Sequence, residues 1–503
     1  MRFASEPGRV ALAIIATFTV MRLVLATAVG LGLDGDYTVG VAHDLDLSYY
    51  DHPPLQYWIV HLFLPLLGDG SAMRLPFIAL FAGSCWLLYL LTRRLFSAPA
   101  GVIAVLALNC SAHFTFGVGD LVMPDGPLIF SQLAAALVLA RGLFPGHDPA
   151  PSAFTTWLHC GFWIGVAALS KYHALLFAAG VLLFLLTVPG QRRQLAHPAP
   201  WLGALLAVAI ASPVIVWNVR HNWISVGFQA GRAAGTGLHI EHVLLNVGAQ
   251  AVWLLPWIFV PLLLAAWQAW RTGPADERSW FSLCLALPTI ALFTLVPLWG
   301  SVGLPHWQMP GWLMLFPALG NWTLRTIRPP TVRRWCAASA TAVLVFAALI
   351  VVHASTGFGR TLAPRLFAQG DPTLQVFEWN QLPVELESRG LLRMGTFVIA
   401  PDWIYAGKID HVLHDGVPVV IFGGDPKQFG LRYDPRSLLG RDALVVWPAD
   451  SMHGIAADLR PYFGSIEELA PLYLGRSGLR EVHLRLFWAH RLERTLPAPY
   501  WGR

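Results

Sequence analysis

Charged residues are scarce in this sequence. Asp, Glu, Lys and Arg make up only 13% of the 503 residues, whereas 55% are hydrophobic and the mean hydropathy is +0.55. A soluble protein of this size carries about 25% charged residues. The deficit argues against an ordinary soluble enzyme, and the composition predicts a polytopic membrane protein.

Cysteine motifs, internal repeats and low-complexity tracts are also missing. The five cysteines are scattered through apolar runs and form no CxxC pair, so they predict neither a disulfide framework nor a zinc site. The isoelectric point near 9.0 would fit a nucleic-acid partner. The arginines, however, gather at predicted helix ends rather than in one patch, and we expect no nucleic acid.

Long apolar runs are what the sequence has in abundance. A run of roughly 17–25 residues can span a bilayer. Eleven candidates occur, at 10–31, 75–92, 99–118, 124–141, 156–170, 172–188, 200–217, 246–268, 280–299, 307–324 and 335–353. We therefore expect an α-helical polytopic membrane domain over residues 1–354, with about eleven transmembrane helices.

Basic residues are distributed unevenly among the predicted loops. With a cytoplasmic N-terminus, thirteen arginines fall on the cytoplasmic side: Arg2, Arg9, Arg93, Arg94, Arg141, Arg192, Arg193, Arg271, Arg278, Arg325, Arg328, Arg333 and Arg334. Four basic residues fall on the opposite side: Arg74, Lys171, Arg220 and Arg232. Since Lys and Arg favour cytoplasmic loops, we expect a multi-pass protein of the inner (plasma) membrane whose later segments lie outside the cytoplasm.

The last part of the chain has a different pattern. From about residue 371 charges return, and short Val- and Ile-rich runs (GTFVIA, GVPVVIFGGD, DALVVWP, EVHLRLFW) alternate with turn residues. Such runs predict strands, and DWIYAGKIDHVLHDG between two of them predicts a helix. We expect a small extracytoplasmic α/β domain over residues 355–503.

Acidic residues gather in DGDYTVGVAHDLDLSYYDHPPL, the segment that begins at Asp34. Asp34 directly follows the first apolar run, so its carboxylate is expected at the outer membrane surface, where it could accept a proton from an attacking hydroxyl. Asp36 and Asp51 add carboxylate oxygens, and with Asp34 they form a candidate site for a divalent cation. A solvated, non-functional acidic face is the alternative.

Five motifs in fixed order resemble one family. HDLDLSYYDHPPLQYWIVHLF resembles the first extracytoplasmic loop of the GT-C class of membrane glycosyltransferases, in particular the protein mannosyltransferases and the lipid A aminoarabinose and galacturonic acid transferases. MPDGPLIF, GVAALSKYHALL, HNWISVGFQAGR and LPHW resemble later motifs of the same group. One departure is clear: the family's leading acidic pair is Asp34-Gly35 here.

The resemblance implies a GT-C fold and sugar transfer from a polyprenyl-phosphate donor to an acceptor lipid, glycan or protein, without a nucleotide cofactor. Asp34 would be the general base, and Asp125 and Asp51 further catalytic candidates. The leaving phosphate needs cations or hydrogen-bond donors, for which the candidates are Lys171, Arg232, Arg220, His52 and His306.

Simpler roles stay open for several of these side chains. Asp125 could cap a helix, Lys171 could extend its ammonium to the interface, and His306 could be structural. Two other functions also stay open. The chain could transport a lipid-linked sugar, although it shows no duplicated halves, or it could be a non-catalytic subunit, as the Asp34-Gly35 departure allows.

Overall fold

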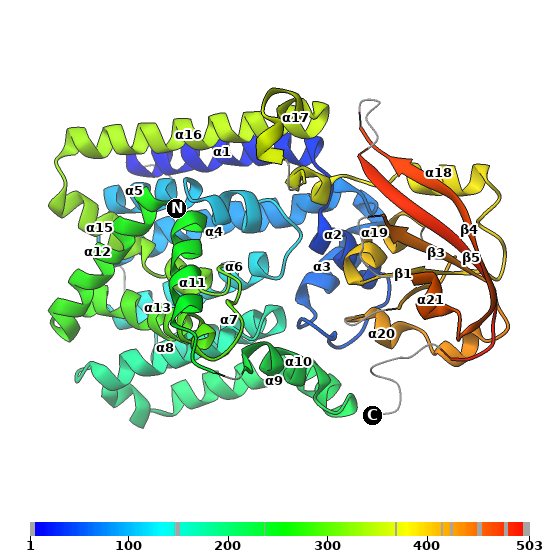
Figure 1. Cartoon of the computed structure of the whole chain (residues 1–503). Coiled ribbons are helices and arrows are strands. Elements are labelled where there is room, and N and C mark those ends of the chain that lie inside the picture. Colours follow the sequence, from blue (N-terminus) through cyan, green and yellow to red (C-terminus); the bar gives the residue numbers. More distant parts are fainter. Residues whose placement is uncertain are drawn as a thin grey trace. The chain divides into compact units, whose positions relative to one another are not determined.

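The computed structural model describes residues 6–144, 146, 151–235, 237–367, 370–413, 416–422, 426–449, 455–476 and 481–495. The chain divides into two compact units (Figure 1). The first comprises Met1–Leu23, Asp46–Gln56 and Leu75–Ala347, and the second comprises Val24–Leu45, Tyr57–Arg74 and Ala348–Arg503. Three boundaries fall inside helices: α1 (Glu6–Ala28), α3 (Leu55–Leu67) and α16 (Pro329–Thr356).

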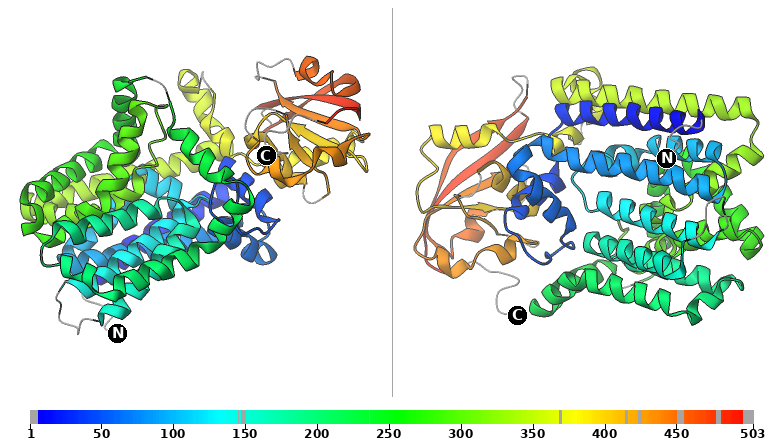
Figure 2. Two further views of the ribbon diagram at one scale, coloured as in Figure 1. Left: turned by 90° about the horizontal axis from the view of Figure 1, so that it is seen from below. Right: turned by 180° about the vertical axis from the view of Figure 1, so that it is seen from behind.

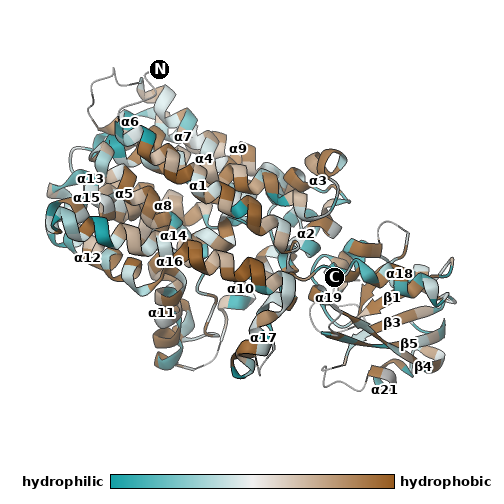
Figure 3. Ribbon diagram, turned by 90° about the horizontal axis from the view of Figure 1, so that it is seen from above, coloured by the Kyte–Doolittle hydropathy of each residue, from teal (hydrophilic) through white to brown (hydrophobic). Residues whose placement is uncertain are grey.

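Helices build the first unit. Besides parts of α1 and α16, they are α4 (Leu75–Leu95), α5 (Ala98–Asn109), α6 (Asp125–Leu143), α7 (Ala153–Ser170), α8 (Ala174–Thr187), α9 (Pro198–Arg220), α10 (Ile224–Ala233), α11 (Ile240–Leu254), α12 (Pro256–Thr272), α13 (Glu277–Leu295), α14 (Met309–Leu313) and α15 (Phe316–Thr326). Hydrophobic residues recur along these helices, as the brown stretches of the ribbon in Figure 3 show. This is the composition expected of helices that face lipid.

Among the described residues, fewer than eleven helices are long and apolar enough to span a membrane. Within the described residues, six helices are long and apolar enough to cross a membrane, and the bent pair α11 and α12 would make seven. Each predicted run coincides with a helix or with successive helices, but some are short or broken. At Leu255, φ is 68° and a proline follows, so the chain bends by 110° between α11 and α12. A multi-pass membrane protein is confirmed, and eleven spans are not.

Two helices of the first unit approach each other through glycine. A Cβ atom on Gly161 of α7 would collide with the carbonyl of Gly203 on α9, and one on Gly203 would collide with the carbonyl of Trp157. Small residues allow such close backbone contact. Close packing of this kind stabilises helix pairs in lipid, where no hydrophobic driving force acts between helices. The contact with α9 therefore fixes the first half and middle of α7, the helix that Lys171 follows.

A five-stranded mixed sheet forms the centre of the second unit (Figure 2). The order is β2-β1-β3-β5-β4, with β1 parallel to β2 and β3, and β5 antiparallel to β3 and β4. The strands are β1 (Phe397–Ala400), β2 (Val419–Ile421), β3 (Ala443–Pro448), β4 (Phe463–Leu474) and β5 (Val482–Leu492). The helices after α16 are α17 (Phe358–Leu362), α18 (Gln381–Ser388), α19 (Trp403–Leu413), α20 (Phe429–Arg432) and α21 (Ile455–Leu459).

The sequence predicts four of the five strands, and β4 is the one it misses. Its residues FGSIEELAPLYL are mostly polar or exposed, and buried positions recur at irregular intervals. A strand without clean alternation of apolar and polar residues gives no period-two signal. The predicted α/β character of the tail is confirmed.

The acid-rich segment is partly helical, where the sequence predicts a loop. Residues Leu33–Ala42 form α2, which belongs to the second unit, and Leu55–Leu67 form α3, which belongs to it from Tyr57 onward. A Cβ on Gly407 of α19 would meet the backbone of Tyr37 in α2, so the two helices pack very closely. Ten residues with two glycines make a poor isolated helix. Tertiary packing on α19, which local sequence does not reveal, stabilises α2.

Candidate active site

A buried ion pair joins the start of α6 to the end of α7 in the first unit. Asp125 is the first residue of α6, and Lys171 directly follows α7. The Lys171 ammonium lies 3.0 Å and 2.9 Å from the two Asp125 carboxylate oxygens, and the residues are only 6% and 1% exposed. Neither a cap of α6 nor an extended surface lysine describes this geometry. The two sequence-predicted residues form one buried charged pair.

Three histidines surround the pair. His113 and His306 are close enough to interact electrostatically with Asp125, and His173 is close enough to interact with both members. The rings of His113 and His306 are stacked with 6.2 Å between centroids and 10° between planes. His173 Nε2 lies 3.1 Å from the carbonyl oxygen of Trp307. The result is a compact group of one carboxylate, one ammonium and three imidazoles.

His113 is the most unusual member of the group. It is 3% exposed, and neither ring nitrogen has a hydrogen-bond partner among the described residues. It begins a π-helical turn, His113–Val118, a distortion often found at functional sites. A buried imidazole without partners costs free energy, which a bound ligand with a hydroxyl or phosphate oxygen would offset.

Arg232 lies on α10 with its guanidinium over two aromatic rings. The guanidinium carbon is 4.7 Å from the centroid of a Trp307 ring and 5.5 Å from that of Phe228. On the same helix, Gln229 Nε2 donates a hydrogen bond of 2.6 Å to the carbonyl oxygen of Asp51. The DHPP segment and the Arg232 helix are therefore held together within the first unit.

The other cationic candidates of the first unit are less closely connected. His52 is half-buried and close enough to interact electrostatically with His173. Arg220 is the last residue of α9 and is exposed. Asp51 itself is 3% exposed. The geometry connects His52 to the histidine group and gives Arg220 no comparable position.

Asp34 and Asp36 belong to the second unit and have opposite surroundings. Asp34 is exposed in the first turn of α2, whereas Asp36 is 2% exposed. Residues two apart on a helix do not face each other. Asp36 Oδ2 lies 2.9 Å from Lys408 Nζ, and Asp36 Oδ1 lies 2.9 Å from His411 Nδ1. This arrangement favours separate roles for the two carboxylates over a shared metal ion.

His411 of the second unit pairs with the Asp36 carboxylate. Burial opposes protonation of His411, but the hydrogen bond and the charge of Asp36 outweigh it and raise the pKa of His411 above its usual value. His411 Nε2 also lies 2.9 Å from the carbonyl oxygen of Asp69. A protonated ring can donate to both acceptors at once. Asp36, Lys408 and His411 thus connect α2 to α19.

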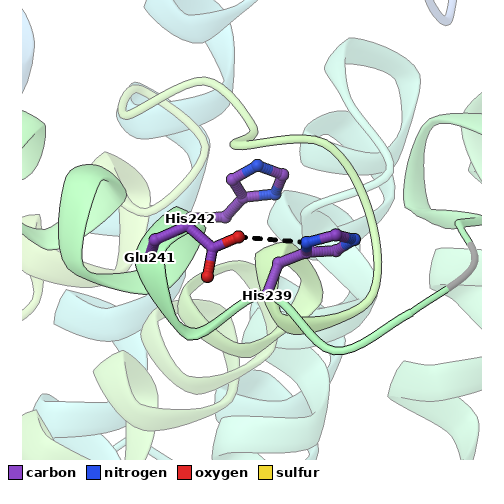
Figure 4. A group of neighbouring side chains, drawn as sticks. All are labelled: His239, Glu241 and His242. Carbon is purple, nitrogen blue, oxygen red and sulfur yellow. Dashed lines mark hydrogen bonds and ion pairs between the residues drawn. The ribbon is translucent and has the colours of Figure 1, made fainter.

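One group of side chains within the described ranges has the composition and spacing of a metal site. It consists of His239, Glu241 and His242, whose ligand atoms lie within 4.8 Å of one another (Figure 4). None of the three is among the sequence-predicted site residues. The sequence shows the pattern His-x-Glu-His, but two histidines and a carboxylate so close in sequence are common on exposed helix ends.

Comparisons with known proteins agree with these motifs. Residues 51–217 match the family model of dolichyl-phosphate-mannose-protein mannosyltransferases. The chain is 27% identical over 305 residues to the lipid A galacturonosyltransferase RgtD of Rhizobium johnstonii, covering 57% of this chain and 60% of RgtD. It is 26% identical over 271 residues to the undecaprenyl phosphate-alpha-4-amino-4-deoxy-L-arabinose arabinosyl transferase of Erwinia tasmaniensis, covering 51% of this chain and 47% of that protein. The matches therefore span half to three fifths of these relatives' lengths.

Solved structures extend the likeness to nearly the whole chain. The crystal structure of ArnT from Cupriavidus metallidurans bound to undecaprenyl phosphate aligns with a TM-score of 0.66, covering 96% of this chain and 98% of that one at 16% identity. The chain therefore shares the fold of this ArnT. The Archaeoglobus fulgidus oligosaccharyltransferase in complex with Zn and sulfate aligns with a TM-score of 0.50 at 13% identity, covering 86% and 68% of the two chains. The predicted GT-C fold is confirmed.

Two members of the histidine group, His173 and His113, are not among the sequence-predicted site residues. His173 lies two residues after Lys171 in the SKYH motif, so proximity to the lysine could have identified it. His113 occurs in NCSAHFTFG, an apolar stretch with no recognisable motif. Only the fold brings it close to Asp125. Such a group of side chains becomes visible only when helices distant in sequence are packed.

Proposed function

We propose that this chain transfers a sugar from a polyprenyl-phosphate donor to a hydroxyl of an acceptor on the extracytoplasmic side of the membrane. The observation that carries the proposal is the buried Asp125–Lys171 pair with its three histidines, within a fold similar to an ArnT that binds undecaprenyl phosphate. The names of the sequence relatives, a galacturonosyltransferase and arabinosyl transferases, support the same reaction class.

Lys171 is our candidate for contact with the donor phosphate. An ammonium group has three N–H donors, and the two contacts with Asp125 leave donor capacity for a phosphate oxygen. Negative charge develops on the leaving phosphate as the glycosidic bond breaks, so a fixed positive charge stabilises the transition state. Arg232 and His306 would add a second cation and a hydrogen-bond donor, with His52 and Arg220 as further candidates.

Asp34 is our candidate for the general base. Its carboxylate is exposed at the first turn of α2, so an acceptor can reach it. In a single displacement, the acceptor oxygen bonds to the anomeric carbon, its proton passes to Asp34, and polyprenyl phosphate leaves with the electrons of the broken C–O bond. The anomeric configuration would invert.

The proposed location is the inner (plasma) membrane with both the reaction and the C-terminal α/β domain outside the cytoplasm. The basis is the excess of arginine in the loops that would then be cytoplasmic. Nucleotide sugars are cytoplasmic compounds, so a reaction outside the cytoplasm uses a lipid-linked donor. For this reason we expect no nucleotide cofactor.

The test is sugar transfer by the purified protein in detergent with an undecaprenyl-phosphate-linked sugar and a membrane glycolipid extract as acceptor. We expect a labelled glycolipid product and release of undecaprenyl phosphate. A flippase would move the donor across a vesicle membrane without forming product, and a non-catalytic subunit would do neither. Either result would overturn the proposal.

A further inference from the structure

A His-x-Glu-His segment opens α11 of the first unit. His239 is the residue before the helix, and Glu241 and His242 lie in its first turn (Figure 4). The site combines two imidazoles with a carboxylate, the ligand set of many three-ligand zinc sites. His239 Nδ1 lies 3.1 Å from Glu241 Oε1. Two ligands of one tetrahedral zinc ion, with bonds of about 2.0–2.1 Å, are about 3.3 Å apart.

The second histidine is oriented as metal ligands usually are. His242 Nδ1 lies 2.9 Å from the carbonyl oxygen of Gly300, which accepts the ring proton and leaves the lone pair on Nε2. A metal-bound imidazole almost always donates its other N–H to such a partner. The rings of His239 and His242 lie 4.6 Å apart and nearly parallel, with 21° between planes. Small side-chain rotations bring both rings to one ion.

The same face of α11 holds the segment that leads to His306. The amide of His239 donates to the carbonyl of Leu298 at 2.7 Å, and Asn246 Nδ2 donates to the carbonyl of Val302 at 2.9 Å. With His242, these positions are spaced by three and four residues, as on one helix face. A metal ion bound at the start of α11 would therefore fix the loop of residues 298–302, which precedes His306.

We propose that His239, Glu241 and His242 bind one divalent transition-metal ion of the zinc type, with water completing the coordination. The ion is structural: it holds the start of α11 in the conformation that fixes residues 298–302. The site does not depend on the proposed sugar transfer, because its ligands belong to neither the Asp125–Lys171 pair nor the acid-rich segment.

The experiment uses the full-length protein in detergent, stripped with a chelator and then given Zn²⁺ alone. We expect one equivalent of zinc to remain after desalting, and Co²⁺ to give the absorption of a tetrahedral site with imidazole ligands. His242→Ala and the conservative Glu241→Gln should each weaken zinc binding by at least about 10- to 100-fold, the loss typical even of outer-shell changes. His159→Ala, which removes an exposed histidine of α7, should bind zinc like the parent.

Zinc should also raise the unfolding temperature of the parent and of His159→Ala, but not that of Glu241→Gln. Two results would overturn the proposal: less than stoichiometric zinc in the parent, or unchanged zinc binding in both cluster variants. Glu241→Gln keeps the helix and the shape of the side chain, so loss of binding there cannot be attributed to unfolding. Neither readout involves sugar transfer, and the proposed reaction can fail while this site stands.

Discussion

Removing the Lys171 ammonium would leave the Asp125 carboxylate buried without its counter-charge. The two residues are 6% and 1% exposed, so water cannot replace the lost partner. Breaking a buried ion pair on one side costs about 3–5 kcal/mol, which corresponds to a factor of about 10² to 10⁴ in the unfolding equilibrium. We expect Lys171→Met, and by the same reasoning Asp125→Asn, to lower the thermal midpoint in detergent markedly.

The double variant Asp125→Asn/Lys171→Met separates stability from function. It leaves no charge at either position of the pair, and replacing both members of a buried pair is often neutral or stabilising. We therefore expect it to regain most of the lost stability, with a coupling energy of at least about 2 kcal/mol. Arg193→Met, which removes an exposed arginine, is the control and should leave the midpoint unchanged.

Transfer activity then decides the role of the pair. If Lys171 contacts the donor phosphate, the stable double variant should still lose about 10- to 150-fold in kcat/KM for the donor, the equivalent of 1.5–3 kcal/mol for a charge-assisted hydrogen bond. The measurement is initial rate at limiting undecaprenyl-phosphate-linked sugar. A double variant that is stable and transfers at the parental rate would refute the catalytic interpretation and make the pair purely structural.

The remaining predictions concern the base, the topology and the second unit. Asp34→Asn should lower turnover by at least about 100-fold, as expected for loss of a general base, with little change in donor affinity. Asp458→Asn, which changes an exposed aspartate, is the control and should leave turnover unchanged. Full turnover in Asp34→Asn would assign the base elsewhere. A reporter active only in the cytoplasm and fused after Arg503 should give no signal, and a strong signal would contradict the proposed orientation. Because the pKa of His411 is raised in the fold, its contribution to stability is complete below the unfolded value of about 6.5 and is lost as the pH rises through the folded value. Stability should therefore fall as the pH rises above about 6.5 in the parent and be flatter in His411→Gln. An equal slope in both would contradict the contact with Asp36.

The elements that the sequence predicts correctly are those with a local signal. Apolar runs become helices because a run of that length has few alternatives in lipid, and β1, β2, β3 and β5 carry Val- and Ile-rich segments between turn residues. The count of eleven spans is not confirmed. A proline after Leu255 turns one predicted run into two helices bent by 110°, and α8 is only fourteen residues long. Hydropathy measures composition and does not report such breaks.

The candidate site was predictable where a motif carried it. Asp125 and Lys171 each lie in a motif, but their pairing across 46 residues is a property of the packed helices. His113 has no motif, and its unpartnered ring nitrogens are visible only when all neighbours are in place. A sequence therefore indicates which side chains are chemically able to act, and the fold decides which of them meet.

Asp36 shows how this distinction changes a functional inference. In the sequence it stands two residues from Asp34 and adds negative charge to the same stretch, which favours a shared cation. In the structure α2 buries Asp36 against Lys408 and His411, 372 and 375 residues away, and leaves Asp34 exposed. A carboxylate already bound by two cationic groups gains little from a metal ion. Asp36 is therefore better suited to hold α2 on α19, and α2 in turn sets the position of Asp34.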